Sequence, residues 1–453
     1  SGADTLTLLA GTPASLTVDT GAGNDTLTLP AADWSATGSI IDIDLGAGTD
    51  TVVFQSGTKI STTAAGSSKL DGAEVLAFAG NAEIQASLVS GKTTAVAATG
   101  TGASHTVTVA VAAADTKVDL STLVGSTSAA SDVSGMTFAV DASANTAAVA
   151  ITGMDEAKNT ISASLAAGDV ITGGDKSDEI IVASSATFVG ATGTPLDTLD
   201  GGSGLNAAGT AQNTDTLTVG DGSNVAVTLG STVAWASIKN FEALKVSSGS
   251  ATATVTLPAA AETAGIASVT SAGTGTAVIS AATYASKVTL NAAASTTAAN
   301  KLTGGAGGDV LVGSTTATNT LTGGAGSDSL TGGAVADTLS GGADNDTIKG
   351  AAGIDTITGG DGNDVIYSGA AAETDADVVD GGAGDDTIIY SAAAEIIASN
   401  AFIDSIDGGA GTSDSIRLSD AAAATLTVAA TDLWGRVSGV EKLVLTSAGT
   451  AAT

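Results

Sequence analysis

A repeat of nine residues fills most of 304–389 and limits the possible folds more than any other feature of the chain. The repeat has the pattern G-G-x-G-x-D-x-U-x, in which U is a large aliphatic residue. Four copies match it at every position and begin at Gly304, Gly323, Gly359 and Gly381. Three imperfect copies fill 332–358 and keep the acidic residue. Five contiguous nonads between 323 and 367 are too regular to arise by chance, so the region is predicted to consist of repeated structural units.

Each nonad combines a tight turn with a very short strand. Glycine permits positive φ and close backbone approach in the first six residues, and the last three are extended enough for a strand. The aliphatic residue at position eight is expected to face inward and to form one narrow core stripe. This stripe comprises Leu311, Leu321, Leu330, Leu339, Ile348, Ile357, Ile366, Val379 and Ile388. The predicted fold is therefore all-β, a β-solenoid or parallel β-roll with additional β-strand modules.

Two nonads are expected to make one coil, so that turns 18 residues apart stack on the same side. This arrangement sorts the acidic positions into two columns. One column holds Asp309, Asp328, Asp346, Asp364 and Asp386, and the other holds Asn319, Asp337, Asp355 and Asp377. Carboxylates stacked in this way repel one another until a cation lies between them.

The nonads resemble the calcium-binding repeats of RTX proteins. In that family two stacked turns each supply carbonyl oxygens and the aspartate of position six to one Ca²⁺, an ion that takes six to eight oxygen ligands. The resemblance implies Ca²⁺ as the cofactor, bound by Asp309, Asp328, Asp337, Asp346, Asp355, Asp364, Asp377 and Asp386 with Gly324, Gly326, Gly360, Gly362, Gly382 and Gly384. Asn319 departs from the family pattern, so a site there would be weaker or empty.

Other aspartates lie in similar but degenerate turns outside the perfect nonads, such as G-A-G-N-D and G-G-D-K-S-D. They form a second set of candidate calcium ligands: Asp25, Asp50, Asp178, Asp200, Asp215, Asp407 and Asp414. The alternative for each is an ordinary aspartate-containing turn.

A longer repeat joins two parts of the chain that are 199 residues apart. The segments T-D-T-L-T-V at 214–219 and W-A-S-I-K-N-F-E-A-L-K-V at 235–246 recur in altered form at 413–418 and 434–445. Trp235 and Trp434 are expected to be packing anchors of these closing units. The predicted organisation is a β module at 1–80, a strand-rich module at 81–170, a β module with Asp-Gly-Gly turns at 171–250, a solenoid segment at 251–300, the RTX β-roll at 301–390 and a C-terminal β module at 391–453 that repeats 200–246.

The balance of charge supports a cation-binding protein. Acidic residues outnumber basic residues by 47 to 14, and the net charge of −33 excludes a nucleic-acid binder. The chain has no cysteine, so any metal must have oxygen ligands. No apolar run approaches the roughly 20 residues that span a bilayer, and no signal peptide opens the chain. Because the chain begins at Ser1 without a Met, we expect it to be a fragment or a processed product.

The sequence predicts no enzymatic activity. The single histidine, His105, cannot complete an H-E-x-x-H motif or a conventional triad, and it is expected to be structural or solvated. No G-x-S-x-G motif occurs, and S-G-T-K at 56–59 lacks the S-D-N and K-T-G motifs that accompany S-x-x-K in β-lactamases.

Calcium nonads, few aromatic residues and Thr/Ala/Val strands closed by F-E-A-L or V-E-K-L together resemble the RTX-type surface-layer proteins of Gram-negative bacteria. The resemblance implies type I secretion, a location on the cell surface and calcium-dependent self-assembly into an extracellular lattice. The expected partners are copies of the chain, and a cell-surface polysaccharide that binds through a part of the protein outside it. Two alternatives are an RTX adhesin or biofilm-matrix protein, and the calcium-binding tail of a type I-secreted enzyme.

Overall fold

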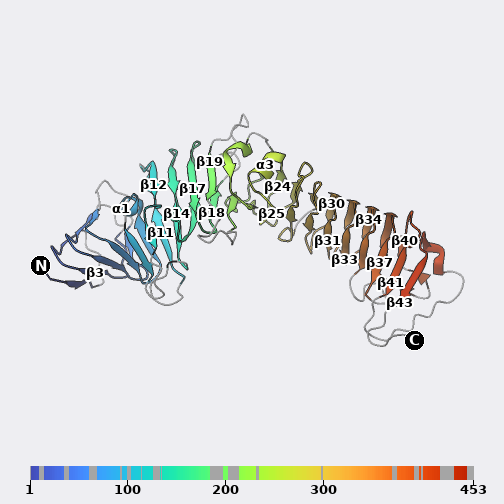
Figure 1. Ribbon diagram of the computed structural model, residues 1–453, viewed down its shortest axis with the longest axis horizontal. Helices are drawn as coiled ribbons and strands as arrows, with labels where there is room; N and C mark the ends of the chain where they lie inside the picture. Colours follow the sequence, from blue (N-terminus) through green and yellow to red (C-terminus); the bar gives the residue numbers. More distant parts are fainter. Residues whose placement is uncertain are drawn as a thin grey trace. The chain divides into compact units, whose positions relative to one another are not determined.

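The computed structural model describes residues 2–9, 15–34, 40–60, 69–91, 94–98, 104–113, 115–125, 133, 135–183, 197–202, 214–230, 234–296, 299–369, 375–391, 397–398, 401–402, 404–418 and 433–445. Short β-strands make up most of these residues (Figure 1). The described strands pair in parallel, except for the antiparallel pair β38 (Ile397–Ala398) and β39 (Ala401–Phe402). The predicted all-β fold with a parallel β-roll is confirmed.

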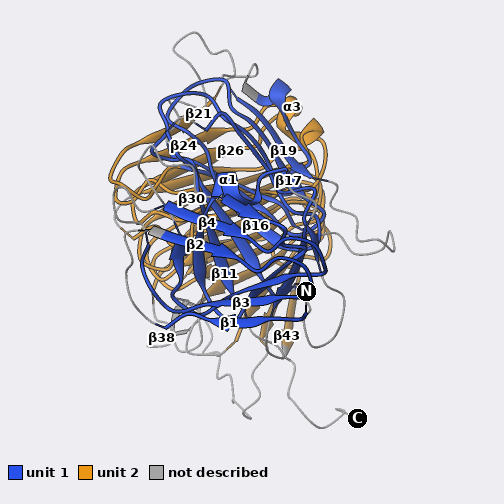
Figure 2. Ribbon diagram, turned by 90° about the vertical axis from the view of Figure 1, so that its left-hand side faces the viewer, with its two compact units in different colours: residues 1–219, 233–242 blue, residues 220–232, 243–453 orange. Residues whose placement is uncertain are grey.

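The chain forms two compact units (Figure 2). Unit 1 comprises Ser1–Val219 and Val233–Glu242, and unit 2 comprises Gly220–Thr232 and Ala243–Thr453. Within unit 2, strands pair in parallel on both sides of the predicted boundary between 300 and 301. A single stack of coils therefore spans the predicted modules 251–300 and 301–390. The division into six modules stays a prediction.

Two parallel sheets build unit 2, and each coil of the chain adds one strand to each sheet. The β30 sheet contains β21 (Val227–Leu229), β24 (Ala253–Thr256), β26 (Ala277–Ser280), β28 (Asn300–Thr303), β30 (Asn319–Ala325), β32 (Thr338–Ala343), β34 (Thr356–Asp361), β36 (Val378–Ala383), β40 (Ser405–Asp407) and β42 (Val437–Ser438). The β31 sheet of this unit contains β23 (Ala243–Val246), β25 (Ser268–Ser271), β27 (Thr289–Asn291), β29 (Val310–Val312), β31 (Ser329–Gly333), β33 (Thr347–Ala351), β35 (Val365–Gly369), β37 (Thr387–Tyr390), β41 (Ser415–Leu418) and β43 (Lys442–Leu445). The helix α3 (Ala259–Thr263) and the 3₁₀ turn η2 (Leu433–Arg436) lie outside the sheets.

The register of the strands shows that one coil contains two nonads. Thr320 pairs with Thr338, and Thr338 pairs with Thr356, which is a step of 18 residues in each case. The next step, from Thr356 to Val378, is longer by four residues because the chain has an insertion after 369. The predicted period of 18 residues is therefore confirmed.

The core of the nonad array is one side chain wide. All nine aliphatic residues of the predicted stripe, from Leu311 to Ile388, are at most 1% exposed. Neighbouring strand residues such as Thr320 and Thr338 point outward. The alternation follows from the period of two in a β-strand, which places successive side chains on opposite faces.

Unit 1 uses the same parallel stacking with more variable coils. Its first sheets contain β1 (Thr5–Thr7), β3 (Thr26–Leu29), β5 (Thr51–Phe54), β8 (Val75–Phe78), β10 (Ala95–Ala98) and β13 (Val124–Gly125), and β2 (Ser15–Asp19), β4 (Ile40–Asp44) and β7 (Lys69–Asp71). Its other sheets contain β6 (Lys59–Ile60), β9 (Ala82–Gln85), β11 (Thr106–Ala110), β14 (Thr137–Asp141), β16 (Lys158–Ser162), β18 (Glu179–Val182) and β20 (Thr216–Val219), and β12 (Lys117–Asp119), β15 (Ala150–Thr152), β17 (Val170–Gly174), β19 (Thr198–Gly202) and β22 (Ile238–Lys239). The helix α1 (Ala86–Val89) and the 3₁₀ turn η1 (Ala234–Ser237) complete the unit.

Aromatic side chains fill the wider core of unit 1. The rings of Phe54 and Phe78 stack with their centroids 4.9 Å apart, and Phe138 meets Phe78 edge-on. Trp235 is 2% exposed, in agreement with its predicted role as a packing anchor. The side chain of Trp434 lies outside the described residues.

One glycine position tests how tightly the coils stack. Gly342 has a φ of +128°, and a Cβ atom there would meet the carbonyl oxygen of Gly324 in the preceding coil. We expect Gly342→Ala to lower the free energy of unfolding by about 2 kcal/mol or more, because strain and a backbone clash combine. Urea denaturation in saturating calcium measures the change. Gly230→Ala, where the added Cβ meets no atom within 4 Å, is the control. Equal stabilities of the two variants would contradict tight stacking.

Candidate metal centre

A ladder of backbone-to-carboxylate hydrogen bonds runs along one side of unit 2. An aspartate precedes each strand of the β31 sheet from β29 to β41. The backbone N–H of each of them except the last, Asp414, donates to a carboxylate oxygen of the aspartate one coil ahead. The N–H donors and Oδ1 acceptors are Asp309 to Asp328 at 2.6 Å, Asp328 to Asp346 at 2.7 Å, Asp346 to Asp364 at 2.8 Å, Asp364 to Asp386 at 2.8 Å and Asp386 to Asp414 at 2.7 Å. The sequence therefore places these carboxylates in one continuous column.

A second ladder runs along the strands of the β30 sheet. Its N–H donors and Oδ1 acceptors are Asn319 to Asp337 at 2.7 Å, Asp337 to Asp355 at 2.8 Å, Asp355 to Asp377 at 2.8 Å and Asp377 to Asp404 at 2.8 Å. The two columns contain the members that the period of 18 residues predicts. The predicted two-column arrangement is thus confirmed.

One oxygen of several ladder carboxylates is buried without a hydrogen-bond partner among the described residues. These oxygens are the Oδ2 atoms of Asp328, Asp346, Asp364, Asp386 and Asp414, and the five side chains are at most 3% exposed. Burying a carboxylate oxygen without a partner costs free energy unless a cation or a proton compensates it. A bound cation would compensate these oxygens.

The turn glycines of successive coils stack closely, backbone against backbone. The carbonyl oxygens of Gly324, Gly360, Gly362, Gly382 and Gly384 each lie where the Cβ of a glycine one coil ahead would be. Gly326 also has positive φ, at +90°. Within the described chain no three acidic or histidine side chains gather closely enough to hold a metal by themselves, so carbonyl oxygens must complete each site. Carboxylate and carbonyl oxygens are the ligands that Ca²⁺ prefers.

Burial shifts the titration of the ladder aspartates toward neutral pH. It raises the pKa of Asp328 and Asp346 to about 7 and that of Asp386 to about 6, although backbone hydrogen bonds oppose the shift. Burial also raises the pKa of Asp309, Asp337, Asp364 and Asp377. Without a cation these carboxyl groups hold protons at a pH at which an exposed aspartate is ionised.

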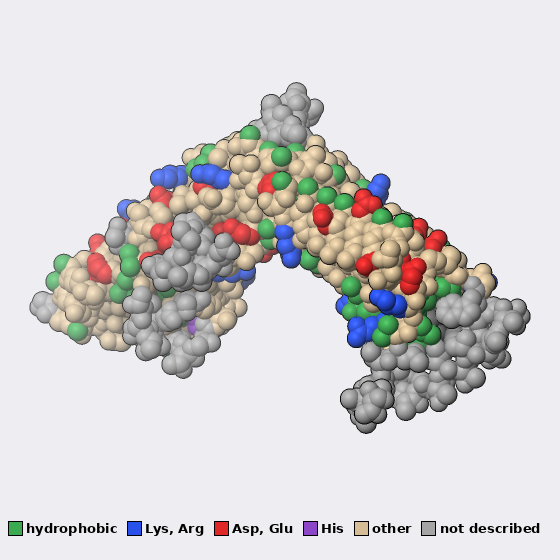
Figure 3. Space-filling view, turned by 45° about the vertical axis from the view of Figure 1, so that its right-hand side comes forward, with side chains coloured by type: hydrophobic (Ala, Val, Ile, Leu, Met, Phe, Trp, Pro, Cys, Tyr) green, Lys and Arg blue, Asp and Glu red, His purple; other side chains and the backbone are tan. Residues whose placement is uncertain are grey.

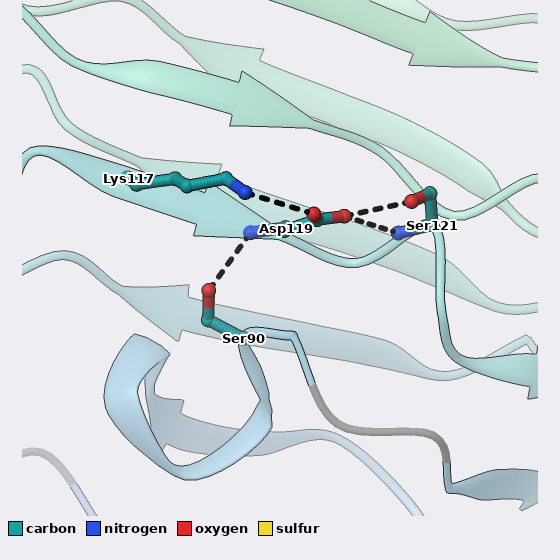
Figure 4. Close-up of polar contacts among 4 residues, drawn as sticks. All are labelled: Ser90, Lys117, Asp119 and Ser121. Carbon is teal, nitrogen blue, oxygen red and sulfur yellow. Dashed lines mark hydrogen bonds and ion pairs between the residues drawn. The ribbon is translucent and has the colours of Figure 1, made fainter.

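Asp119 in unit 1 shows how an aspartate behaves in an ordinary turn (Figure 4). Its Oδ1 accepts hydrogen bonds from the hydroxyl and the backbone N–H of Ser121, and its Oδ2 pairs with Lys117 at 3.3 Å. The hydroxyl of Ser121 is the main cause that lowers the pKa of Asp119, and Lys117 adds to this effect. Local donors thus satisfy Asp119, whereas the Oδ2 atoms of Asp328, Asp346, Asp364, Asp386 and Asp414 have no hydrogen-bond partner among the described residues. Donors do reach the Oδ2 atoms of other ladder members, namely Asp309, Asp337 and Asp377.

Unit 1 contains shorter ladders of the same kind. Asp4 donates to Asp25 at 2.8 Å and Asp25 to Asp50 at 2.6 Å, while Asp178 donates to Asp215 at 2.8 Å. The Oδ2 atoms of Asp25, Asp50 and Asp215 are buried and lack a hydrogen-bond partner among the described residues. Burial raises the pKa of Asp178 to about 6 and that of Asp215 to about 7. Four candidates of the second set, Asp25, Asp50, Asp178 and Asp215, therefore lie in ladder positions, as Asp414 does in unit 2.

Asp200 and Asp407 lie elsewhere. Each is within a strand, and its Oδ1 accepts the N–H of the glycine two residues ahead at 3.2 Å. Asp200 also accepts a hydrogen bond from Asn240 and pairs with Lys239 at 2.7 Å. The structure does not bring these two aspartates into a ladder, and their calcium ligation stays a prediction.

Several ladder members were missed because the sequence analysis required a glycine-rich turn. They are Asp4, Asp169, Asp197 and Asp404, together with Asn159 and Asn300. The signal they share is the shorter pattern D-x-U or N-x-U, in which U is an aliphatic residue. This residue is buried in every case except that of Asp4, where Leu6 is 39% exposed. This pattern identifies ladder positions even where the preceding turn has no glycine.

At Asn319 the ladder position has a side-chain amide in place of a carboxylate. Its Nδ2 donates to the carbonyl oxygen of Ser314 at 3.0 Å and to Oδ1 of Asp337 at 2.9 Å. Asn159 makes the same contacts to Met154 and Asp178. An N–H donor thus takes oxygens that would otherwise face a cation, which agrees with the weak or empty site predicted at Asn319.

The comparison with protein families agrees with this geometry. The family model of the RTX calcium-binding nonapeptide repeat (4 copies) matches residues 295–317, 303–339, 314–348, 340–372 and 370–394. A search of the curated proteins finds no match to the chain. The chain therefore contains RTX nonapeptide repeats, and these repeats bind calcium.

The exchange of an amide for a carboxylate can be tested at Asn319. We expect Asn319→Asp to add one calcium ion to the binding stoichiometry, because a carboxylate removes the competing N–H donor and supplies an oxygen ligand. Isothermal titration calorimetry measures the number of ions. The control is Asn345→Asp, which adds the same charge to an exposed turn of the array. An unchanged ion count in Asn319→Asp would contradict the conclusion that the Asn319 amide blocks a calcium site.

The raised pKa values predict an unusual pH dependence for the calcium-free protein. Unfolded aspartate titrates near pH 4, whereas Asp328 and Asp346 titrate at about 7 in the fold. Proton uptake therefore stabilises the calcium-free array fully below about pH 4, and this stabilisation is lost as the pH rises through about 7. We expect circular dichroism to show more β structure at pH 5 than at pH 8 without calcium, and little difference in millimolar calcium. A calcium-free β signal that increases with pH would be the opposite result.

Proposed function

We propose that this protein is an extracellular structural protein that folds on calcium and then assembles with copies of itself into a surface layer. The observation that carries the proposal is the column of buried carboxylates that links one coil to the next, several of which have an oxygen with no hydrogen-bond partner within the described part of the chain. Because each backbone-to-carboxylate hydrogen bond joins two coils, loss of the cations weakens the stack as a whole. Binding free energy at such sites becomes folding free energy.

The calcium concentration outside cells suits such a protein. Extracellular calcium modules commonly bind at about 0.1 to 1 mM, whereas cytosolic sensors bind far more tightly. RTX repeat proteins are typically secreted. No helix in the described part of the chain has the length and apolar character that crossing a membrane requires.

The exposed surface supports a structural role for the chain. In the view of Figure 3 neutral side chains and backbone dominate, and acidic and basic groups are scattered among them. A parallel stack leaves one edge of backbone N–H and C=O groups at each end, and an edge needs a cap or a partner. Pairing between copies in register produces an extended assembly, and a cell-surface polysaccharide is the proposed anchor.

Imaging with and without calcium tests the proposal. We expect purified protein to remain monomeric in a chelator and to form ordered sheets or filaments in millimolar calcium, as seen by negative-stain electron microscopy. Circular dichroism on the same samples reports folding. Folded monomers in calcium would favour the adhesin, the matrix protein or the calcium-binding tail of a secreted enzyme. Magnesium is the matched control, because it demands a tighter octahedral site and retains its waters.

A further inference from the structure

Three glutamates occupy the same place, each at the end of a ladder. The backbone N–H of Asp50 donates to Oε2 of Glu74, that of Asp215 to Oε2 of Glu242, and that of Asp414 to Oε2 of Glu441, each at 2.8 Å. Two of these ladder ends are in unit 1 and one is in unit 2. The pattern of a terminal glutamate is thus repeated in separate parts of the chain.

The backbone at these glutamates differs from the backbone inside a ladder. Inside, the aspartate N–H points forward to the next carboxylate, and only the following residue donates back to the preceding coil, as Val365 does to the carbonyl of Asp346 at 2.9 Å. At the end, the glutamate N–H itself points back. Glu74 donates to the carbonyl of Asp50 at 3.1 Å, Glu242 to that of Asp215 at 3.2 Å and Glu441 to that of Asp414 at 3.0 Å. The reversed N–H therefore needs no carboxylate from a further coil.

The turn before each glutamate explains the reversal. Two residues upstream, Gly72, Asn240 and Gly439 have φ values of +69°, +59° and +64°. Glycine adopts this left-handed conformation readily, and asparagine tolerates it better than most residues. Two residues downstream stands a leucine in each copy, as in the D-x-U pattern of the ladders. A glutamate has one methylene more than an aspartate, so its carboxylate still reaches the N–H of the preceding coil.

The aspartate one coil before each glutamate has a buried carboxylate oxygen that a cation could bind. The side chains of Asp50, Asp215 and Asp414 are at most 1% exposed, and their Oδ2 atoms have no hydrogen-bond partner among the described residues. Each of these oxygens lies one coil from the terminal glutamate. All three aspartates lie outside the stretch that the repeat family matches, 295–394.

We propose that Glu74, Glu242 and Glu441 close three separate calcium ladders, each glutamate supplying the last carboxylate for the terminal ion. Two of the ladders lie outside the nonapeptide array. Each ladder takes up calcium as a segment of its own, because the reversed amide breaks the chain of forward hydrogen bonds. This inference rests on calcium binding and not on assembly into a layer.

Shortening one glutamate at a time in the full chain tests this role. We expect Glu441→Asp to raise the calcium concentration that half-protects residues 415–418 from hydrogen exchange roughly tenfold, as removal of a ligand-supporting carboxylate does in other metal sites. Protection of residues 51–54 should not change. Glu74→Asp should raise the calcium concentration that half-protects residues 51–54 and leave the protection of 415–418 unchanged. Glu441→Gln keeps an oxygen that accepts the amide hydrogen bond of Asp414, so it should weaken calcium binding without loss of the fold.

Glu83→Asp is the matched control, because Glu83 is outside the ladders and forms a partly exposed ion pair with Lys59 at 3.5 Å. An unchanged calcium midpoint in both aspartate variants would overturn the proposal. So would an equal shift of 51–54 and 415–418 in either one, because the ladders would then not be separate. Exchange mass spectrometry reads both segments in the same sample, and neither outcome depends on whether the protein forms a layer.

Discussion

The hydrogen bond from one backbone amide to a carboxylate in the next coil is the interaction on which this structure depends. It requires parallel strands in register, because the donor and the acceptor hold the same place in successive coils. It occupies only one oxygen of each aspartate, and the second oxygen of several of them is buried without a hydrogen-bond partner among the described residues, which costs free energy. Oxygen-seeking cations remove this cost, and the fold and the metal thereby become one equilibrium.

The width of the coil decides which side chains form the core. An 18-residue coil leaves space for a single aliphatic side chain from each strand, and leucine, isoleucine and valine fill it in the nonad array. Thr26 pairs with Thr51 in unit 1, and this longer coil accommodates the stacked rings of Phe54 and Phe78.

The nonads predicted the parallel roll, the core stripe and both columns, because each depends only on a fixed period. The positions with variable spacing were harder to predict. Asp404 follows Asp377 by 27 residues, and no glycine-rich turn precedes it, so the nine-residue repeat did not predict its place in the ladder. Asp200 and Asp407 have the glycines but stand three residues after the ladder positions of Asp197 and Asp404, inside a strand. Their outward direction follows from strand alternation, which requires a register that turn composition does not supply.

The two columns end differently. One ends at Glu441, and the last carboxylate of the other within the described residues is that of Asp404, whose Oδ2 accepts a hydrogen bond from the hydroxyl of Tyr390. Duplication of a whole coil within the gene would preserve both endings and every rung between them. Duplication of a single nonad would exchange the columns for all residues downstream and would present the wrong ending to each. Such arrays can therefore change length during evolution in steps of two nonads, with the terminal sequences kept intact.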